Sequence, residues 1–178
     1  MTFFCVADIM NEMIIKNRGA IMKKSAFFEN AKLLNDKFAI IPLMYGSLGL
    51  EYITGENLNA DDVDILIPEI LVDDKWDIFK NTLESEGYVL IDEHEHSFQK
   101  NDVCYAYAAV EELESFAGIS MLETERQNVD DVTFKVLSLE QYLKVYRASV
   151  KDGYRVNVRK KKDGEKIDFI KKHLKEDL

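Results

Sequence analysis

Two aspartates placed two residues apart, Asp62 and Asp64, are the side chains of this sequence best suited to chemistry. They begin the segment 62–67, in which polar and apolar residues alternate at first and which Pro68 ends, a pattern that predicts a strand. Side chains at positions i and i+2 of a strand point to the same face, roughly 6–7 Å apart. Such a pair of carboxylates can hold one Mg²⁺ or Mn²⁺ ion. These ions prefer oxygen ligands and are commonly bound by carboxylates and substrate phosphates together.

A glycine-serine pair, Gly46-Ser47, precedes the aspartates and ends the apolar run 40–45, which predicts a buried strand. Glycine lets the backbone approach a phosphate closely, and the Ser47 hydroxyl and local N–H groups can donate hydrogen bonds to phosphate oxygens. Alone, the pair is explained by a plain turn, and the aspartates by a solvated strand start. Together, the two motifs predict a site for a metal and the phosphates of a nucleotide.

The elements that must position these residues follow from apolar spacing and turn chemistry. Helices are predicted at 25–37, 48–53, 73–86, from 138 onward, where Ser138 and Gln141 resemble a capping box, and at 164–176. Strands are predicted at 40–45, 62–67, 88–91, and in a hairpin of 97–100 with 103–109. The expected fold class is α/β (α+β), with a small mixed β-sheet flanked by helices.

In this arrangement the sequence resembles the nucleotidyltransferase superfamily, the palm-like fold of polymerase beta, aminoglycoside nucleotidyltransferases and small MNT-type proteins. The resemblance rests on Gly46-Ser47 and Asp62-Val63-Asp64-Ile65 and covers residues 25–110. It implies Mg²⁺-dependent transfer of NMP from an NTP to a hydroxyl acceptor. It also implies that Asp62 and Asp64 are catalytic metal ligands and that Gly46 and Ser47 bind the nucleotide. A looser likeness continues through 137–140 and 159–163 into the C-terminal helical part.

The sequence departs from the family pattern in two places. Fourteen residues separate Ser47 from Asp62, a longer spacing than in the compact motif. Active members also carry a third carboxylate on a later strand, where it helps to deprotonate the acceptor and to bind a second metal. The corresponding strand, 103–108, contains no acid, and replacements are available only at its ends: Asp102, Glu111 or Glu112. The alternative function is therefore a catalytically inactive nucleotidyltransferase-fold binding module, antitoxin-like or a nucleotide sensor.

Two other clusters could contribute to a site. The segment 159–162 is basic. We select Arg159 and Lys162 as nucleotide-binding residues that neutralise triphosphate charge or contact the acceptor. The alternative is that the segment is a solvated loop and helix start. Asp92, His94 and His96 would share one strand face and could hold a metal, but an exposed polar hairpin edge explains them with fewer assumptions. We expect Tyr142, Tyr146 and Tyr154 to belong to the core.

Composition limits the possible partners and surroundings. The chain has 178 residues and a formal charge of -10, which disfavours long RNA as acceptor and leaves a small molecule or a protein. Its two cysteines do not have the spacing of a disulfide framework or a zinc site, so a cytoplasmic location is expected. Charged residues interrupt every apolar run near the N-terminus, so no membrane span is expected. We divide the chain into an N-terminal extension (1–21), a palm (22–136) and a helical part packed on it (137–178); the sequence does not indicate an oligomeric state.

Overall fold

The computed structural model describes residues 6–151 and 160–176. The described elements comprise seven helices, one 3-10 turn and seven strands. In chain order they are α1 (Val6–Phe38), β1 (Leu43–Met44), α2 (Gly46–Thr54), β2 (Val63–Ile67), α3 (Glu69–Val72), α4 (Trp76–Ser85), β3 (Val89–Asp92), β4 (Ser97–Lys100), β5 (Val103–Ala109), α5 (Glu112–Ala117), η1 (Met121–Glu123), β6 (Glu125–Val129), β7 (Val132–Val136), α6 (Leu139–Lys151) and α7 (Lys160–Glu176).

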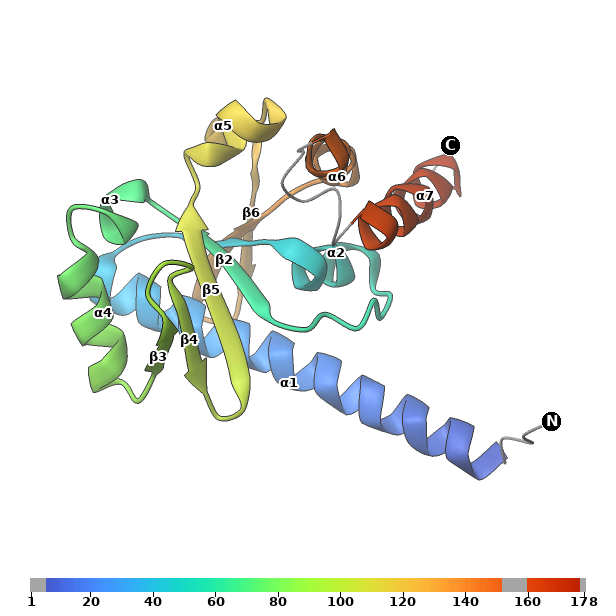
Figure 1. Cartoon of the computed structure of the whole chain (residues 1–178), viewed down its shortest axis with the longest axis horizontal. Coiled ribbons are helices and arrows are strands. Elements are labelled where there is room, and N and C mark those ends of the chain that lie inside the picture. The colour runs from blue at the N-terminus through green and yellow to red at the C-terminus, as the bar shows by residue number, and fades with distance from the viewer. Residues whose placement is uncertain (1–5, 152–159, 177–178) are drawn as a thin grey trace.

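The strands form one mixed sheet in the order β3-β4-β5-β2-β1-β7-β6, which confirms the predicted α/β class (Figure 1). At its centre β1 runs antiparallel to β2, with Met44 opposite Ile65, and β2 runs parallel to β5, with Asp64 opposite Ala106. The outer pairs are antiparallel hairpins, β3 with β4 and β6 with β7. The two strands beside which the predicted motifs lie are therefore hydrogen-bonded neighbours in the middle of the sheet.

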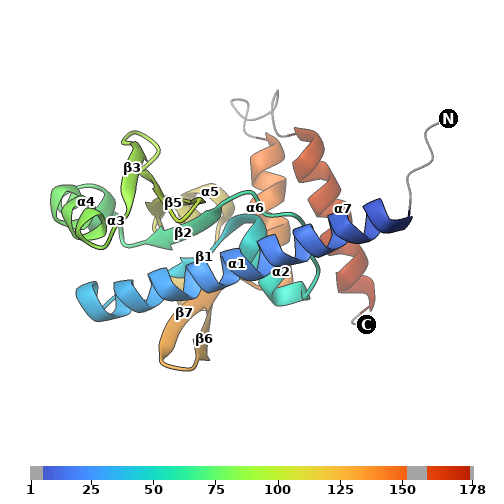
Figure 2. The ribbon, with the colours of Figure 1, turned by 90° about the horizontal axis from the view of Figure 1, so that it is seen from below.

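Two apolar layers cover the sheet. Alternate residues of β2 and β5, such as Ile65 and Tyr107, point to one face and pack with Phe27 of α1 and Phe79 of α4. The opposite layer contains Leu66 of β2 and the buried residues of α5, α6 and α7. Helix α1 accordingly crosses one face of the sheet, while the three C-terminal helices gather on the other (Figure 2).

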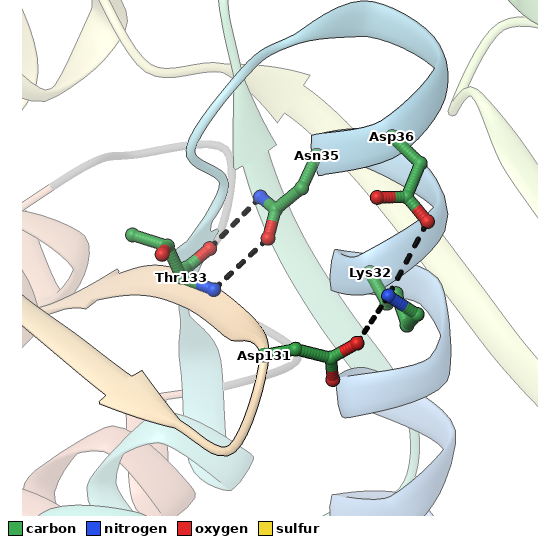
Figure 3. A network of polar contacts seen from close by, with 5 residues as sticks. All are labelled: Lys32, Asn35, Asp36, Asp131 and Thr133. Atoms are coloured by element: carbon green, nitrogen blue, oxygen red, sulfur yellow. Dashed lines mark hydrogen bonds and ion pairs between the residues drawn. The ribbon is translucent and has the colours of Figure 1, made fainter.

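A polar contact attaches α1 to the β6-β7 hairpin (Figure 3). The Asn35 side-chain amide donates to the Thr133 carbonyl over 2.9 Å, and its oxygen accepts from the Thr133 N–H at 2.9 Å. Lys32 adds exposed ion pairs with Asp131 and, at 3.4 Å, with Asp36. The two hydrogen bonds between the Asn35 amide and the Thr133 backbone resemble the bonds between neighbouring strands and hold the hairpin against α1. The exposed ion pairs of Lys32 contribute little to stability.

Most predicted elements occur with shifted ends. The strand expected at 40–45 is reduced to β1, because Pro42 lacks an N–H and the chain joins the ladder only after it; the Pro42 carbonyl accepts from the Lys135 N–H at 2.8 Å. The β6-β7 hairpin was not predicted, because β6 is polar and largely exposed and so lacks apolar alternation. Helix α1 runs unbroken across positions 21 and 22, where the predicted extension was divided from the palm.

No helix in the described part of the chain is long and apolar enough to cross a membrane.

Candidate functional site

The end of β1 and the start of β2 lie side by side, which brings the two predicted motifs together. The Tyr45 N–H donates to the Asp64 carbonyl over 3.0 Å, and Gly46 follows as the first residue of α2. The two motifs come close because β1 and β2 are antiparallel, so the last residue of β1 lies opposite the first residues of β2. The glycine-serine pair and the aspartates thus occupy the same end of two adjacent strands.

Gly46 packs directly against the Asp64 carboxylate. A Cβ atom added to Gly46 would lie 1.8 Å from Asp64 Oδ2, and Gly46 has a φ of +62°, in the left-handed region. Both facts require glycine: the conformation disfavours other residues, and a side chain would displace the carboxylate. The backbone is therefore shaped around an acidic group at the beginning of a helix, where anionic groups are favoured by the exposed N–H groups.

Both aspartates are half-buried, and strand alternation places Asp64 on the side of the C-terminal helices. Val63 and Ile65 belong to the α1 layer, and Leu66 belongs to the opposite layer. Asp64 therefore points to the face covered by α5, α6 and α7, since side chains alternate along a strand. Asp62 lies one residue before β2. Two half-buried carboxylates beside a close-packed glycine fit a hard divalent cation that completes its coordination with water and phosphate.

A buried glutamate holds the connection that leads into the aspartates. Glu51 of α2 is 1% exposed, and its Oε1 accepts from the Leu58 and Ala60 N–H groups, both at 2.9 Å. Lys23 Nζ of α1 donates to the Ala60 carbonyl over 2.5 Å. These bonds order the segment between α2 and β2, so the fourteen-residue spacing is occupied by a helix and an anchored loop.

Lys166 of α7 is a residue of the site that the sequence analysis missed. Its Nζ donates to Ser47 Oγ over 2.7 Å and lies 5.0 Å from the centre of the Tyr146 ring. The signal that could have found it is its position on the inward stripe of α7. It stands three residues after Asp163 and four before Ile170, which are 6% and 0% exposed.

The basic residues that were predicted instead lie at or before the start of α7. Lys162 Nζ is 3.6 Å from Asp61 Oδ2, and the two side chains are 73% and 82% exposed, so the pair is solvated and weak. It nevertheless puts Lys162 beside the loop residue that precedes Asp62. Arg159 lies outside the described residues. Asp163, next in sequence, accepts from Ser149 Oγ at 2.7 Å inside the α6-α7 interface and so fixes α7 against α6.

The tyrosines of α6 are core residues, as predicted for Tyr142 and Tyr146; Tyr154 lies outside the described residues. The Tyr142 hydroxyl donates to the Met44 carbonyl over 3.4 Å and sits against Gly49. Burial is the main cause that raises the pKa of Tyr142 well above its ordinary value. Burial likewise raises the pKa of Tyr146, with smaller contributions from Tyr45, Asp163 and Asp64. Both phenols therefore stay neutral beside the aspartates.

A third acid does not join the aspartates among the described residues, where no group of three or more His, Cys, Asp or Glu side chains could hold a metal. Ala106 is opposite Asp64 in the β2-β5 ladder. Of the possible replacements, Asp102 is exposed in the β4-β5 turn and Glu111 accepts from the Glu69 N–H at 2.8 Å beyond the far end of β2. Glu112 begins α5.

The acidic and histidine-rich segment forms the β3-β4 turn at the edge of the sheet. Asp92 Oδ1 accepts from the His94 and Glu95 N–H groups at 2.9 and 3.1 Å. The His96 ring packs on Trp76, with 4.5 Å between ring centres. These contacts satisfy the residues locally, in agreement with a polar hairpin edge.

Comparison with known proteins gives a relative without an assigned role. No model of a known protein family matches the sequence. The chain is 37% identical over 149 residues to the uncharacterized protein YnaI of Bacillus subtilis (strain 168), and the match covers 84% of this chain and 96% of that protein. The chain therefore belongs to the same family as YnaI of Bacillus subtilis.

Proposed function

We propose that this chain binds a nucleoside triphosphate with Mg²⁺, or Mn²⁺, and transfers its NMP group to a hydroxyl acceptor. The observation that carries the proposal is the packing of Gly46 against the Asp64 carboxylate, with a Cβ position only 1.8 Å from Oδ2. Glycine adopts this left-handed conformation without strain, and because it lacks a side chain the backbone at the start of α2 can approach the Asp64 carboxylate closely. The family resemblance carried by the same residues gives that ligand as an NTP.

Each residue of the site has a physical task in this proposal. Asp62 and Asp64 would hold the divalent cation, which when bound neutralises phosphate charge and orients the phosphates. The N–H groups at the start of α2 and the Ser47 hydroxyl would donate to phosphate oxygens. Lys166, already hydrogen-bonded to Ser47 at 2.7 Å, would supply a positive charge to the triphosphate. Lys162 and Arg159 remain proposed contacts at the rim.

The reaction would be an in-line displacement. The acceptor oxygen forms a bond to the α-phosphorus, the bond between the α-phosphorus and the β-bridging oxygen breaks, and pyrophosphate leaves. The chain's own groups contribute positioning and charge stabilisation rather than a covalent intermediate. The formal charge of -10 favours a small molecule or a protein over long RNA as acceptor, and the cysteine usage favours the cytoplasm as the compartment.

A second function, a nucleotide-binding module without catalysis, is favoured by Ala106. This residue faces Asp64 across the parallel ladder, where a third carboxylate would have to lie to reach the acceptor hydroxyl. Such a module would act as a nucleotide sensor or as the antitoxin-like partner of another protein. Both functions begin with the same binding step and differ only in turnover.

Turnover therefore decides between them. The chain is incubated with each of the four NTPs, Mg²⁺ and a small-molecule metabolite extract as a source of acceptors, and pyrophosphate release is measured. Release that needs both Mg²⁺ and Asp64 supports the transferase. NTP binding without release, also with Mn²⁺ and with a protein extract as acceptor source, supports the binding module. Absence of both binding and release contradicts the proposal in either form.

A further inference from the structure

A cavity of about 320 Å³ opens on the sheet face to which Asp64 points. Its floor is formed by Leu66 of β2 and Ala108 of β5, its walls by Tyr45, Leu113 and Phe116, and Glu112 lies at one side. This volume falls at the lower end of the range for sites that bind small molecules, which are typically concave and mostly apolar with a few polar groups. The cavity is too small for a folded partner and large enough for a single-ring compound.

The cavity is adjacent to the candidate site along β2. Leu66 is two residues after Asp64, so it lies on the same face roughly 6–7 Å further along β2. Ala108 is opposite Leu66 in the β2-β5 ladder, as Ala106 is opposite Asp64. Tyr45, which lines the cavity, also donates its N–H to the Asp64 carbonyl and immediately precedes Gly46. A molecule in the cavity would therefore lie next to Asp64 along β2.

The two sides of the candidate site carry opposite charges. Lys166, on α7, contacts Ser47, whereas Glu112 of α5 alone carries a charge among the described residues that line the cavity. Helix α6 lies between α5 and α7 in both views (Figure 1, Figure 2). A triphosphate is attracted to the Lys166 side and repelled from the Glu112 side. The cavity consequently suits a second, differently charged molecule.

We propose that this cavity is the acceptor subsite and takes a small hydroxyl compound with an aromatic body and an ammonium group. The inference rests on the proposed function and adds the substrate class. Tyr45 and Phe116 offer aromatic walls for a ring, and Glu112 offers a carboxylate for the ammonium group. In the transfer, the acceptor oxygen bonds to the α-phosphorus, pyrophosphate departs with the electrons of the broken P–O bond, and the hydroxyl proton passes to water.

A matched pair of probes tests the cavity on the full chain. Tyramine carries a phenol ring and an ammonium group, and 4-hydroxyphenylacetate has a carboxylate in place of the terminal aminomethyl group of tyramine. We expect tyramine to bind at least about tenfold more tightly by calorimetry, because the anion is repelled by Glu112. Glu112→Gln should remove most of this preference. Glu114→Gln, on the exposed side of the same helix and outside the cavity, should leave it unchanged.

A second variant and a separate nucleotide titration make the outcomes distinct. Ala108→Leu should fill the floor and weaken both probes while NTP binding stays as in the parent chain. If NTP binds but tyramine does not, or if the two probes bind equally, the acceptor subsite is wrong and the proposed function stands. If tyramine binds with the expected preference but no NTP binds, both the assignment of the cavity as an acceptor subsite and the proposed function are wrong.

Discussion

Lys166 Nζ and Ser47 Oγ are 2.7 Å apart, although the two residues are 119 positions apart in the sequence. The contact joins the C-terminal helix α7 to the first turn of α2, beside the Asp64 carboxylate. It puts a cation at the position where the resemblance expects phosphates. Ser149 and Asp163, joined inside the α6-α7 interface at 2.7 Å, hold α7 in the orientation that makes this contact.

Replacing Lys166 by methionine should weaken NTP binding by roughly tenfold or more. The variant keeps the apolar stem that packs near Tyr146 and removes the charge, and hydrogen bonds to charged groups are worth about 1.5–3 kcal/mol. Calorimetric titration with Mg²⁺ and NTP measures the change. Lys171→Met on the same helix is the control, because Lys171 is exposed and makes only a 4.0 Å ion pair with Asp168. Equal affinities for the two variants would remove Lys166 from the site.

The glycine at position 46 should be irreplaceable for a reason other than its backbone angle. Gly46 and Gly55 both have positive φ values, +62° and +73°, but a Cβ at Gly55 would meet no atom within 4 Å. Alanine at either position costs about 1–2 kcal/mol for the left-handed conformation. Gly46→Ala should additionally displace Asp64 and abolish NTP binding, whereas Gly55→Ala should bind as the parent chain does.

Thermal unfolding and nucleotide titration of the two alanine variants measure these effects. A larger loss of stability is expected for Gly46→Ala, because its Cβ would lie 1.8 Å from Asp64 Oδ2. Indistinguishable melting temperatures and affinities for the two variants would show that Gly46 is only a turn residue.

The buried tyrosines should make the fold sensitive to alkaline pH. Burial is the largest cause that raises the pKa of the five phenols with shifted values: Tyr88, Tyr105, Tyr107, Tyr142 and Tyr146. The unfolded chain loses these protons near pH 10, about the ordinary tyrosine value, while the folded chain retains them. Their contribution to stability is therefore complete below about pH 10 and is lost as pH rises above it.

Tyrosinate absorbance and circular dichroism, followed together from neutral to alkaline pH, test this expectation. The buried phenols should ionise only as the fold is lost, after the more exposed ones have titrated. If every tyrosine ionised near pH 10 with an unchanged dichroism spectrum, the packing described for α6 and β5 would be wrong.

The sequence predicts much of the central sheet because local signals are strong there. Apolar runs, Pro68, and the Asn101-Asp102 turn indicate β1, β2 and the β4-β5 hairpin. The i and i+2 spacing predicts that Asp62 and Asp64 share a strand face, whereas in the structure Asp62 lies in a bend one residue before β2. Their closeness to Gly46 could be expected from the family resemblance, but the antiparallel β1-β2 register that produces it appears only in the structure.

The remaining features depend on packing between distant segments. In the sequence, nothing distinguishes Lys166 from the other lysines of its basic helix. Its contact with Ser47 becomes evident only when α7 is packed on α6 and near α2. The polar strand β6 belongs to a hairpin whose other strand, β7, is held to α1 by the contact between Asn35 and Thr133. The cavity requires α5 to stand over β2 and β5, an arrangement that no local pattern in Glu112–Ala117 indicates.

The central claim is that Asp62 and Asp64 hold a metal for a bound nucleotide, and calorimetric titration with the four NTPs and Mg²⁺ tests it most directly. We predict that the parent chain and Asp61→Asn, altered only in the exposed loop residue, bind one or more NTPs when Mg²⁺ is present. The double variant Asp62→Asn with Asp64→Asn should fold normally and lose this binding. Equal NTP affinity in the double variant and the parent chain, or no Mg²⁺-dependent binding by the parent chain, would contradict the account.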